Sequence, residues 1–200
     1  MRPMFYRLKN KTHAREELVR MYRDLTGRQG LRPDGQYWTL CGTQTARNSE
    51  LRQLCHLGLL VDAQFHGVDF DPKIIGKNRR IFPQAHWYAG SWSSVIRTLE
   101  FRPEVVYLDT MNVVGLAPAR RIIKETIFQC PKGTILFINL MQTNPYSGYN
   151  RAPNDEEVLN NIEQDIPPEI LSYWEDTGKH YVYSATSITR MATYVLRRVR

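Results

Sequence analysis

Several residues that could bind a ligand follow directly after short apolar segments of the sequence. Gly42 has no side chain, so the backbone there can come close to a ligand. Asp69 could hold the two hydroxyls of a ribose, and Trp92 could stack on a base. Asp109 is a further acidic residue at a comparable place. These residue types could together form a site for a ligand that contains a ribose and a base.

The apolar segments before these residues have the composition of short β-strands. They comprise residues 37–41, 64–68, 85–88, 104–108 and 134–138. A first helix is indicated by apolar residues at helical spacing from Leu18 to Leu25, with an N-cap at Thr12 and a terminal glycine at Gly27. Later helix starts are indicated by capping residues, namely Asn48 or Ser49, Asp71 followed by Pro72, and Ser91 or Ser93.

This alternation of strands and helices predicts an α/β fold, with a doubly wound, mostly parallel sheet covered by helices on both faces. The two closing segments, 180–186 and 191–199, have no helix between them and predict an antiparallel C-terminal hairpin. Before them, a helix beginning at Pro167-Pro168 is expected to run through Trp174, and Asn154 with Glu157 indicates another helix start. Ligands of such sheets bind beyond the carboxyl ends of the strands, where the residues named above lie.

The charge of the chain is basic and unevenly distributed. The chain has 27 Lys and Arg against 20 Asp and Glu, a formal net charge of +7. Residues 1–35 contain nine basic and four acidic residues, whereas residues 151–176 contain one basic and eight acidic residues. The basic segments favour a polyanionic partner, because clustered cations gain affinity by releasing phosphate counterions. The alternative is a basic protein whose charge has no such role.

Several classes of protein are disfavoured by the composition. No stretch of about 18 apolar residues is present, so we expect no transmembrane helix, and the first residues do not resemble a signal peptide. Three widely spaced cysteines, Cys41, Cys55 and Cys130, fit buried thiols in the reducing cytoplasm. The five histidines are isolated, so no metal site is expected. A Gly-x-Gly-x-x-Gly motif is absent, which disfavours a nicotinamide-binding oxidoreductase.

The chain resembles the class I S-adenosylmethionine-dependent methyltransferases from about Tyr37 to its end. The resemblance depends on four short segments at the predicted strand ends: 40–43, 67–69, 90–92 and 108–109. It implies a Rossmann-like methyltransferase fold whose last two strands form a reversed hairpin. The sequence departs from the family pattern in its first loop, which has one glycine, and at Ser91, where an aspartate is common.

The resemblance also implies a role for each matching residue with S-adenosylmethionine as the cofactor. Cys41, Gly42 and Thr43 would lie at the amino-acid end of the cofactor. Asp69 would bind the ribose hydroxyls, and Phe70 would flank the adenine. Ser91 and Trp92 would touch the adenine rim, and Asp109 would face the methionine or the substrate.

The residues that would contact the methyl acceptor are less well defined. Asn144-Pro145-Tyr146 is similar to the Asn-Pro-Pro-Tyr signature of amino-methylating DNA enzymes, in which an amide binds the target amino group and an aromatic ring stacks on the flipped base. This segment follows the fifth strand instead of the fourth and lacks one proline, so an ordinary turn is the alternative. The candidate catalytic residues are therefore Asp109, Asn144 and Tyr146.

These observations lead to one functional hypothesis and two alternatives. The hypothesis is a single Rossmann-like domain over residues 1–200, with residues 1–35 as a basic helical extension, that methylates a nucleic acid, DNA or RNA. The first alternative is a degenerate methyltransferase fold that serves as a non-catalytic nucleic-acid-binding or assembly module. The second is a methyltransferase acting on a small molecule or a protein. No membrane partner is expected, and the oligomeric state is left open.

Overall fold

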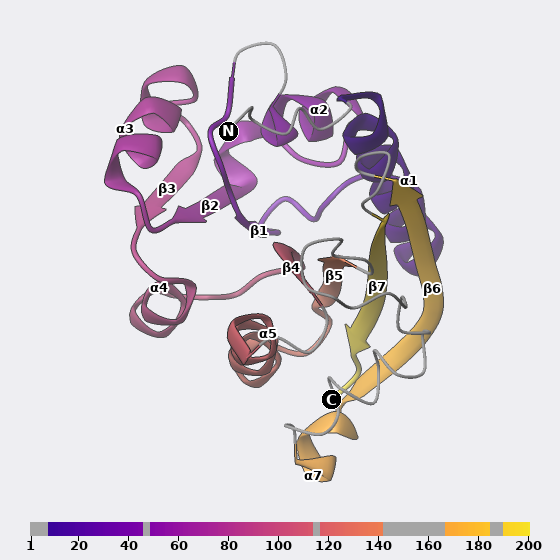
Figure 1. Ribbon diagram of the computed structural model, residues 1–200. Coiled ribbons are helices and arrows are strands. Elements are labelled where there is room, and N and C mark those ends of the chain that lie inside the picture. The colour runs from indigo at the N-terminus through magenta and orange to yellow at the C-terminus, as the bar shows by residue number, and fades with distance from the viewer. Residues whose placement is uncertain (1–7, 46–48, 114–116, 142–166, 185–189) are drawn as a thin grey trace.

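The strands of the chain form one mixed sheet. The computed structural model describes residues 8–45, 49–113, 117–141, 167–184 and 190–200, and structural statements here concern those residues (Figure 1). The parallel strands are β1 (Tyr37–Leu40), β2 (Phe65–Asp69), β3 (His86–Ala89), β4 (Val105–Val113) and β5 (Ile135–Met141). The antiparallel strands are β6 (Trp174–Ser184) and β7 (Arg190–Arg198).

The strand order confirms the predicted fold class. Within the described residues, the sheet has seven strands in the order β3-β2-β1-β4-β5-β7-β6. Strand order reverses between β1 and β4, and ligands of doubly wound sheets bind at this switch point, beyond the carboxyl ends of the strands. The predicted C-terminal hairpin is also confirmed, since β6 and β7 pair antiparallel from Trp174 opposite Arg198 to Ser184 opposite Arg190.

Helices cover both faces of this sheet (Figure 1). One group consists of α1 (Leu8–Thr26), α2 (Glu50–His56) and α3 (Pro72–Ile81), and the other includes α4 (Trp92–Thr98) and α5 (Ala117–Gln129). Adjacent residues of β1 point to the two faces, as the period of a strand requires. Tyr37 packs in a cluster with Leu18 of α1 and Leu51 of α2, whereas Trp38 packs in a cluster with Ile96 of α4 and Ile127 of α5. Two separate apolar layers therefore hold the strand ends in place.

Three predicted helix caps are observed. The side chains of Ser49, Asp71 and Ser91 each accept a hydrogen bond from a backbone N–H in the first turn of the following helix. Gly27 has a φ of 69° directly after α1, a conformation that favours glycine. These caps set the boundaries of the loops at the carboxyl edge of the sheet.

Two predicted helix boundaries are wrong. Helix α1 begins at Leu8, so Thr12 is inside the helix and does not cap it; the preceding Leu and Lys residues favour helix and extend it by one turn. The helix at Pro168 is only the short α7 (Pro168–Leu171), and Trp174 is the first residue of β6. Trp174 is buried against the sheet, and this tertiary packing outweighs the helical pattern. The helix start predicted at residues 154–157 lies outside the described residues.

Helix α1, which lies in the basic N-terminal segment, packs against the sheet. Leu18, Val19, Met21 and Tyr22 of α1 are all buried in the cluster that covers one face. Among the helices that the structure describes, none is long and apolar enough to span a membrane.

Candidate functional site

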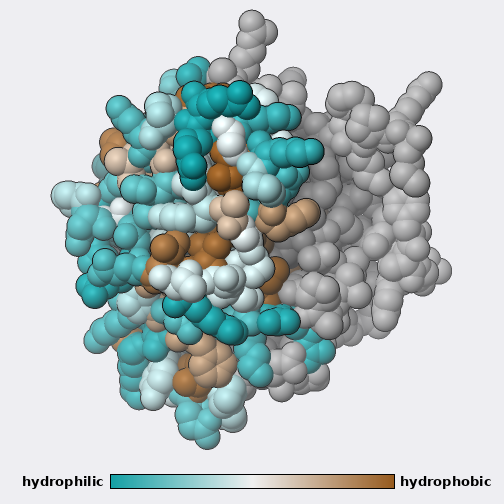
Figure 2. Space-filling view, turned by 90° about the vertical axis from the view of Figure 1, so that its left-hand side faces the viewer, coloured by the Kyte–Doolittle hydropathy of each residue, from teal (hydrophilic) through white to brown (hydrophobic). Residues whose placement is uncertain are grey.

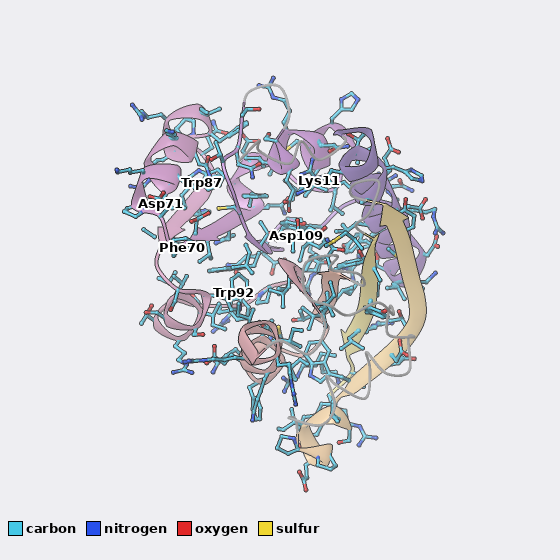
Figure 3. The ribbon with its side chains drawn as sticks, viewed as in Figure 1. Lys11, Phe70, Asp71, Trp87, Trp92 and Asp109 are labelled. Carbon is cyan, nitrogen blue, oxygen red and sulfur yellow. The ribbon has the colours of Figure 1, made fainter. Side chains whose placement is uncertain are left out.

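A cleft of about 410 Å³ lies at the carboxyl edge of the sheet. Its walls come from the N-terminal half of α1, the end of β1, the loop that follows β1, helix α2 and Asp109 of β4. Lys11 and Asp109, which face each other across this region, are labelled in Figure 3. The cleft is therefore at the switch point in strand order, where the sequence predicted a ligand.

Gly42 lines this cleft, and neither its backbone conformation nor its protein neighbours require a glycine at this position. The residue is exposed and does not have a positive φ. A Cβ built on it would meet no described atom within 4 Å. Backbone conformation and protein packing would therefore both tolerate a side chain, and the absence of one keeps the wall of the cleft open to a closely bound ligand.

The loop after β1 is held by one side chain of α3 and by a contact to α2. The Gln44 backbone N–H donates to Oδ1 of Asn78 at 2.9 Å, and Nδ2 of Asn78 donates to the Gly42 carbonyl at 3.1 Å. Oε1 of Gln44 accepts from the Glu50 backbone N–H at 2.9 Å. Asn78 and Gln44 are buried, so these hydrogen bonds fix the loop in one position. A signal for Asn78 was available in the sequence, because it is a polar residue on the otherwise apolar face of its helix.

Asp69 is the last residue of β2, and one of its two carboxylate oxygens is held by a hydrogen bond. Its Oδ1 accepts from the Asp71 backbone N–H at 2.8 Å, and among the described residues its Oδ2 has no hydrogen-bond partner. Burial raises the pKa of this carboxyl above its usual value, while the bond from Asp71 opposes the shift. Phe70 follows with 84% of its surface exposed. Figure 3 shows Phe70 and Asp71 at the loop between β2 and α3.

Ser91 and Trp92 have structural roles in this conformation. Ser91 caps α4 by accepting from the Ser94 backbone N–H. Trp92 is 3% exposed, and its Nε1 donates to Oγ1 of Thr126 at 2.8 Å. The indole also makes an edge-to-face contact with Phe101. Trp92 is thus packed in the core in this structure, and its position at an adenine rim stays a prediction.

Asp109 is held at the cleft by a chain of polar side chains from three strands. Its Oδ1 accepts from Nδ2 of Asn139 in β5 at 2.8 Å. Oδ1 of Asn139 accepts in turn from Oγ1 of Thr193 in β7 at 3.1 Å. On the other side, Nζ of Lys11 lies 3.5 Å from Oδ2 of Asp109, and the Asp109 side chain is 17% exposed. The sequence indicated Asp109 but not Lys11, which is 98 residues away along the chain.

Glu50 is a buried acid beside the same cleft. One of its oxygens accepts from the Tyr37 hydroxyl at 2.8 Å. Burial raises the pKa of Glu50, and the nearby Arg15 guanidinium opposes that shift. Arg15 also donates to Oε1 of Gln53 at 2.7 Å. Neither Glu50 nor Arg15 was singled out from the sequence, because each depends on contacts between helices and strands far apart in the chain.

The remaining candidates divide into buried, exposed and undescribed residues. Cys41 is buried, and burial raises the pKa of its thiol well above the usual range. Thr43 is exposed and lines the cleft. Asn144 and Tyr146 lie outside the described residues. The described residues contain no cluster of three or more His, Cys, Asp or Glu side chains that could hold a metal ion.

Many cations of the basic N-terminal segment are used in internal contacts. Arg20 pairs with Glu17 and Asp24 on its own helix. Arg28 and Arg32 both bind the buried carboxylate of Glu104. These side chains are consequently less available to an external polyanion than the sequence indicated.

Helices α2 and α3 carry exposed cations that make no such ion pairs within the described part of the chain. Lys73 and Lys77 of α3 and Arg52 of α2 are exposed, and their side chains make no ion pair with any described residue. Arg52 lines the carboxyl-edge cleft, whereas Lys73 and Lys77 lie on α3, the helix that is joined to the loop after β1 through Asn78.

The strand order and the carboxyl-edge cleft define the fold of the class I S-adenosylmethionine-dependent methyltransferases. Solved structures with this fold are similar to the chain over most of its length. TrmN from Thermus thermophilus has a TM-score of 0.57 and 12% identity, over 94% of this chain and 48% of TrmN. The N-methyltransferase NodS from Bradyrhizobium japonicum WM9 has a TM-score of 0.59 and 10% identity, over 96% of this chain and 98% of NodS.

A third similar structure contains the expected cofactor. A point mutant of MtNAS in complex with S-adenosylmethionine has a TM-score of 0.50 and 13% identity, over 93% of this chain and 62% of MtNAS. The chain thus spans about half of TrmN and less than two thirds of MtNAS. No protein-family model and no curated protein matches the sequence. At these sequence identities the similarity establishes the fold alone. The part of the predicted resemblance that concerns the fold is therefore confirmed.

Proposed function

We propose that the chain binds S-adenosylmethionine at the carboxyl-edge cleft and transfers its methyl group to an acceptor. The observation that carries this proposal is Gly42, which lines the cleft with open space where a side chain would be. Oδ2 of Asp69, which accepts from no described residue, supports it at the neighbouring strand end, because a ribose needs an acceptor there. When bound, S-adenosylmethionine supplies a methyl group on an activated sulfonium.

Each residue of the site has a role in binding or orientation. Gly42 and Thr43 leave room for the amino-acid end of the cofactor, and Asp69 accepts from the ribose hydroxyls. Phe70 offers an exposed ring beside the adenine. Asp109, oriented by Asn139, presents a carboxylate that can accept a hydrogen bond from the acceptor or from the amino group of the cofactor. Most of the rate enhancement then comes from positioning.

We also propose a nucleic acid as the acceptor, with α2 and α3 as the surface that holds it. The formal net charge of +7, Arg52 on the wall of the cleft and the exposed Lys73 and Lys77 of α3 support this choice. Asn144 and Tyr146 stay candidates for contact with the target base.

Calorimetric titration with S-adenosylmethionine and S-adenosylhomocysteine, with NAD as a control ligand, tests the cofactor. We expect both sulfur ligands to bind and NAD not to bind. Asp69→Ala should weaken binding on the order of a hundredfold, because two hydrogen bonds to a charged acceptor are lost. Asp34→Ala, the same substitution at an exposed aspartate on the opposite edge of the sheet, should have no effect. Absence of binding by the parent protein would overturn the proposal and favour a degenerate fold.

Salt-dependent binding of labelled single-stranded DNA and RNA tests the acceptor class. We expect the logarithm of affinity to fall linearly with the logarithm of salt concentration. The double variant Lys73→Glu/Lys77→Glu should weaken binding and lower the slope by about 2, one unit for each lost phosphate contact. The control variant Lys124→Glu/Lys132→Glu changes two exposed lysines away from α3 and should behave like the parent. Equal effects of both variants would refute the assignment of α3.

A further inference from the structure

A column of nearly parallel rings crosses the sheet at the amino ends of three strands. Trp38 of β1, His66 of β2 and His86 of β3 stand directly opposite one another in the strand register. The ring centroids of Trp38 and His66 are 4.5 Å apart with an interplanar angle of 18°. Those of His66 and His86 are 4.4 Å apart with an angle of 17°. These are distances at which planar rings stack.

The outer end of this column is open. In the described sheet β3 is the edge strand, so no strand covers the outer side of His86. Trp38 is fully buried and His66 is 6% exposed, whereas His86 is exposed. The inner face of the His86 imidazole is therefore covered by His66 and its outer face is accessible. Figure 2 views the side of the molecule that carries this edge, where small hydrophobic patches interrupt a mostly hydrophilic surface.

The inner rings of the column are fixed. Burial and the neighbouring His86 lower the pKa of His66 to about 3, so the middle ring is neutral near pH 7. Nδ1 of His66 lies 3.0 Å from the Tyr88 hydroxyl, and the Tyr88 ring stacks on Trp38 at 5.3 Å. A rigid stack reduces the entropy lost when another ring is added.

A cavity of about 430 Å³ adjoins the column at the amino edge of the sheet. This volume is in the range of small-molecule sites. All three rings of the column line it, together with polar and apolar groups that include Tyr88, Gln64, Leu99, Asp34 and Glu100. Glu100 also pairs with Arg102 at 3.0 Å, and both side chains of this pair are highly exposed.

We propose that this cavity binds an uncharged nucleoside whose base carries an exocyclic amino group and stacks on the outer face of His86. The base would extend the column by one ring at the same spacing. The carboxylates of Asp34 and Glu100 can accept hydrogen bonds from the amino group, and they disfavour a phosphorylated ligand through repulsion. This site is at the opposite edge of the sheet from the cofactor cleft and does not depend on the function proposed for that cleft.

Titration of the full chain with cytidine, in the presence of saturating S-adenosylhomocysteine, tests the site without competition from the carboxyl-edge cleft. The readouts are calorimetry and the NMR signal of the Trp38 indole N–H. His86→Ala should weaken cytidine binding by about tenfold to a hundredfold, the range for loss of one base-stacking ring. His86→Phe keeps a planar ring and should bind within about threefold of the parent. His13→Ala, an exposed histidine on α1 away from the cavity, is the matched control and should bind as the parent does.

Two further measurements define the class of ligand and distinguish this proposal from the cofactor proposal. Cytidine monophosphate should bind more weakly than cytidine, and equal binding would overturn the choice of an uncharged ligand. No cytidine binding by the parent, or equal binding by His86→Ala, would overturn the site itself. Binding of cytidine by a protein that does not bind S-adenosylhomocysteine would support this site while refuting only the cofactor proposal.

Discussion

Two carboxylates, one directly before β4 and one in the middle of this strand, have very different surroundings. Glu104, immediately before the strand, is 3% exposed and accepts from the Tyr22 hydroxyl at 2.7 Å, from Arg28 at 2.8 Å and from Arg32 through its backbone and side chain at 2.9 and 3.2 Å. Asp109, five residues later, is 17% exposed, and its closest partners are Asn139 at 2.8 Å and Lys11 at 3.5 Å.

The difference distinguishes a structural carboxylate from one available to a ligand. Strand β1 pairs with β4 only as far as Tyr107, and the register of β4 with β5 shifts after Asp109. In the described sheet, β4 therefore has no strand neighbour on its β1 side beyond Tyr107, and the cleft that Asp109 lines opens there. At the amino end the segment after α1 closes over Glu104 and satisfies it. One edge of the sheet stabilises the fold, and the other leaves polar groups accessible.

The largest expected effect is the loss of the buried carboxylate at Glu104. Glu104→Ala leaves the Tyr22 hydroxyl without this acceptor and frees two guanidinium groups, so the free energy of unfolding should fall by about 3 kcal/mol. Denaturant unfolding measures this change. Glu104→Gln retains an acceptor oxygen and should lose less. A loss below about 1 kcal/mol for the alanine variant would show that the network is not structural.

The next effect concerns the pH dependence of stability at the amino edge. The pKa of His66 is about 3 in the folded chain, against an ordinary value of 6.5. The unfolded chain therefore binds one more proton between these values, and the free energy of unfolding falls as the pH falls through that window. Between pH 7 and pH 5 this loss should be about 2 kcal/mol. The His66→Phe variant should not show this loss of unfolding free energy between pH 7 and pH 5. If its stability depends on pH as that of the parent does, other titratable groups cause the loss.

A smaller effect is expected when a methyl group is added at the carboxyl edge. Gly42→Ala should weaken S-adenosylhomocysteine binding about tenfold, because the new methyl group occupies space required by the ligand. The unfolding free energy should stay the same or rise by less than about 1 kcal/mol, since the backbone there tolerates alanine. Gly76→Ala on α3 is the matched control: its Cβ also meets no described atom, and it should leave affinity unchanged. Calorimetry and denaturant unfolding check both variants.

The sequence predicts most of the carboxyl edge because that edge depends on local signals. The ends of β1, before Gly42, and of β2, at Asp69, follow from short apolar segments, and the caps at Ser49 and Asp71 follow from the preferences of helix starts. The strand end predicted before Asp109 is wrong, because β4 stays paired with β5 at Asp109 and continues to Val113. The doubly wound order follows from the alternation of elements and its handedness. These features need no knowledge of distant contacts.

The rest of the site depends on contacts between residues far apart in the chain. Lys11 reaches Asp109 over 98 residues, and Asn78 reaches the loop after β1 over 34 and 36 residues. Trp92 was expected at the ligand because of its place after β3, but Thr126 and Phe101 draw its ring into the core. A local pattern shows that an aromatic residue is near a strand end, whereas tertiary packing decides which way its ring points.

The smallest expected effect provides the sharpest test of the contrast between Glu104 and Asp109. Lys11→Ala removes a partly exposed ion pair to Asp109 with an Nζ to Oδ2 distance of 3.5 Å. Its cost in unfolding free energy should be under about 0.5 kcal/mol, because such pairs are screened by solvent and restrict a long side chain. Denaturant unfolding at low and high salt measures it, and the small difference should shrink further at high salt. A cost close to that of Glu104→Ala would mean that Asp109 is also a structural carboxylate, and the contrast between the closed and the open edge would not hold.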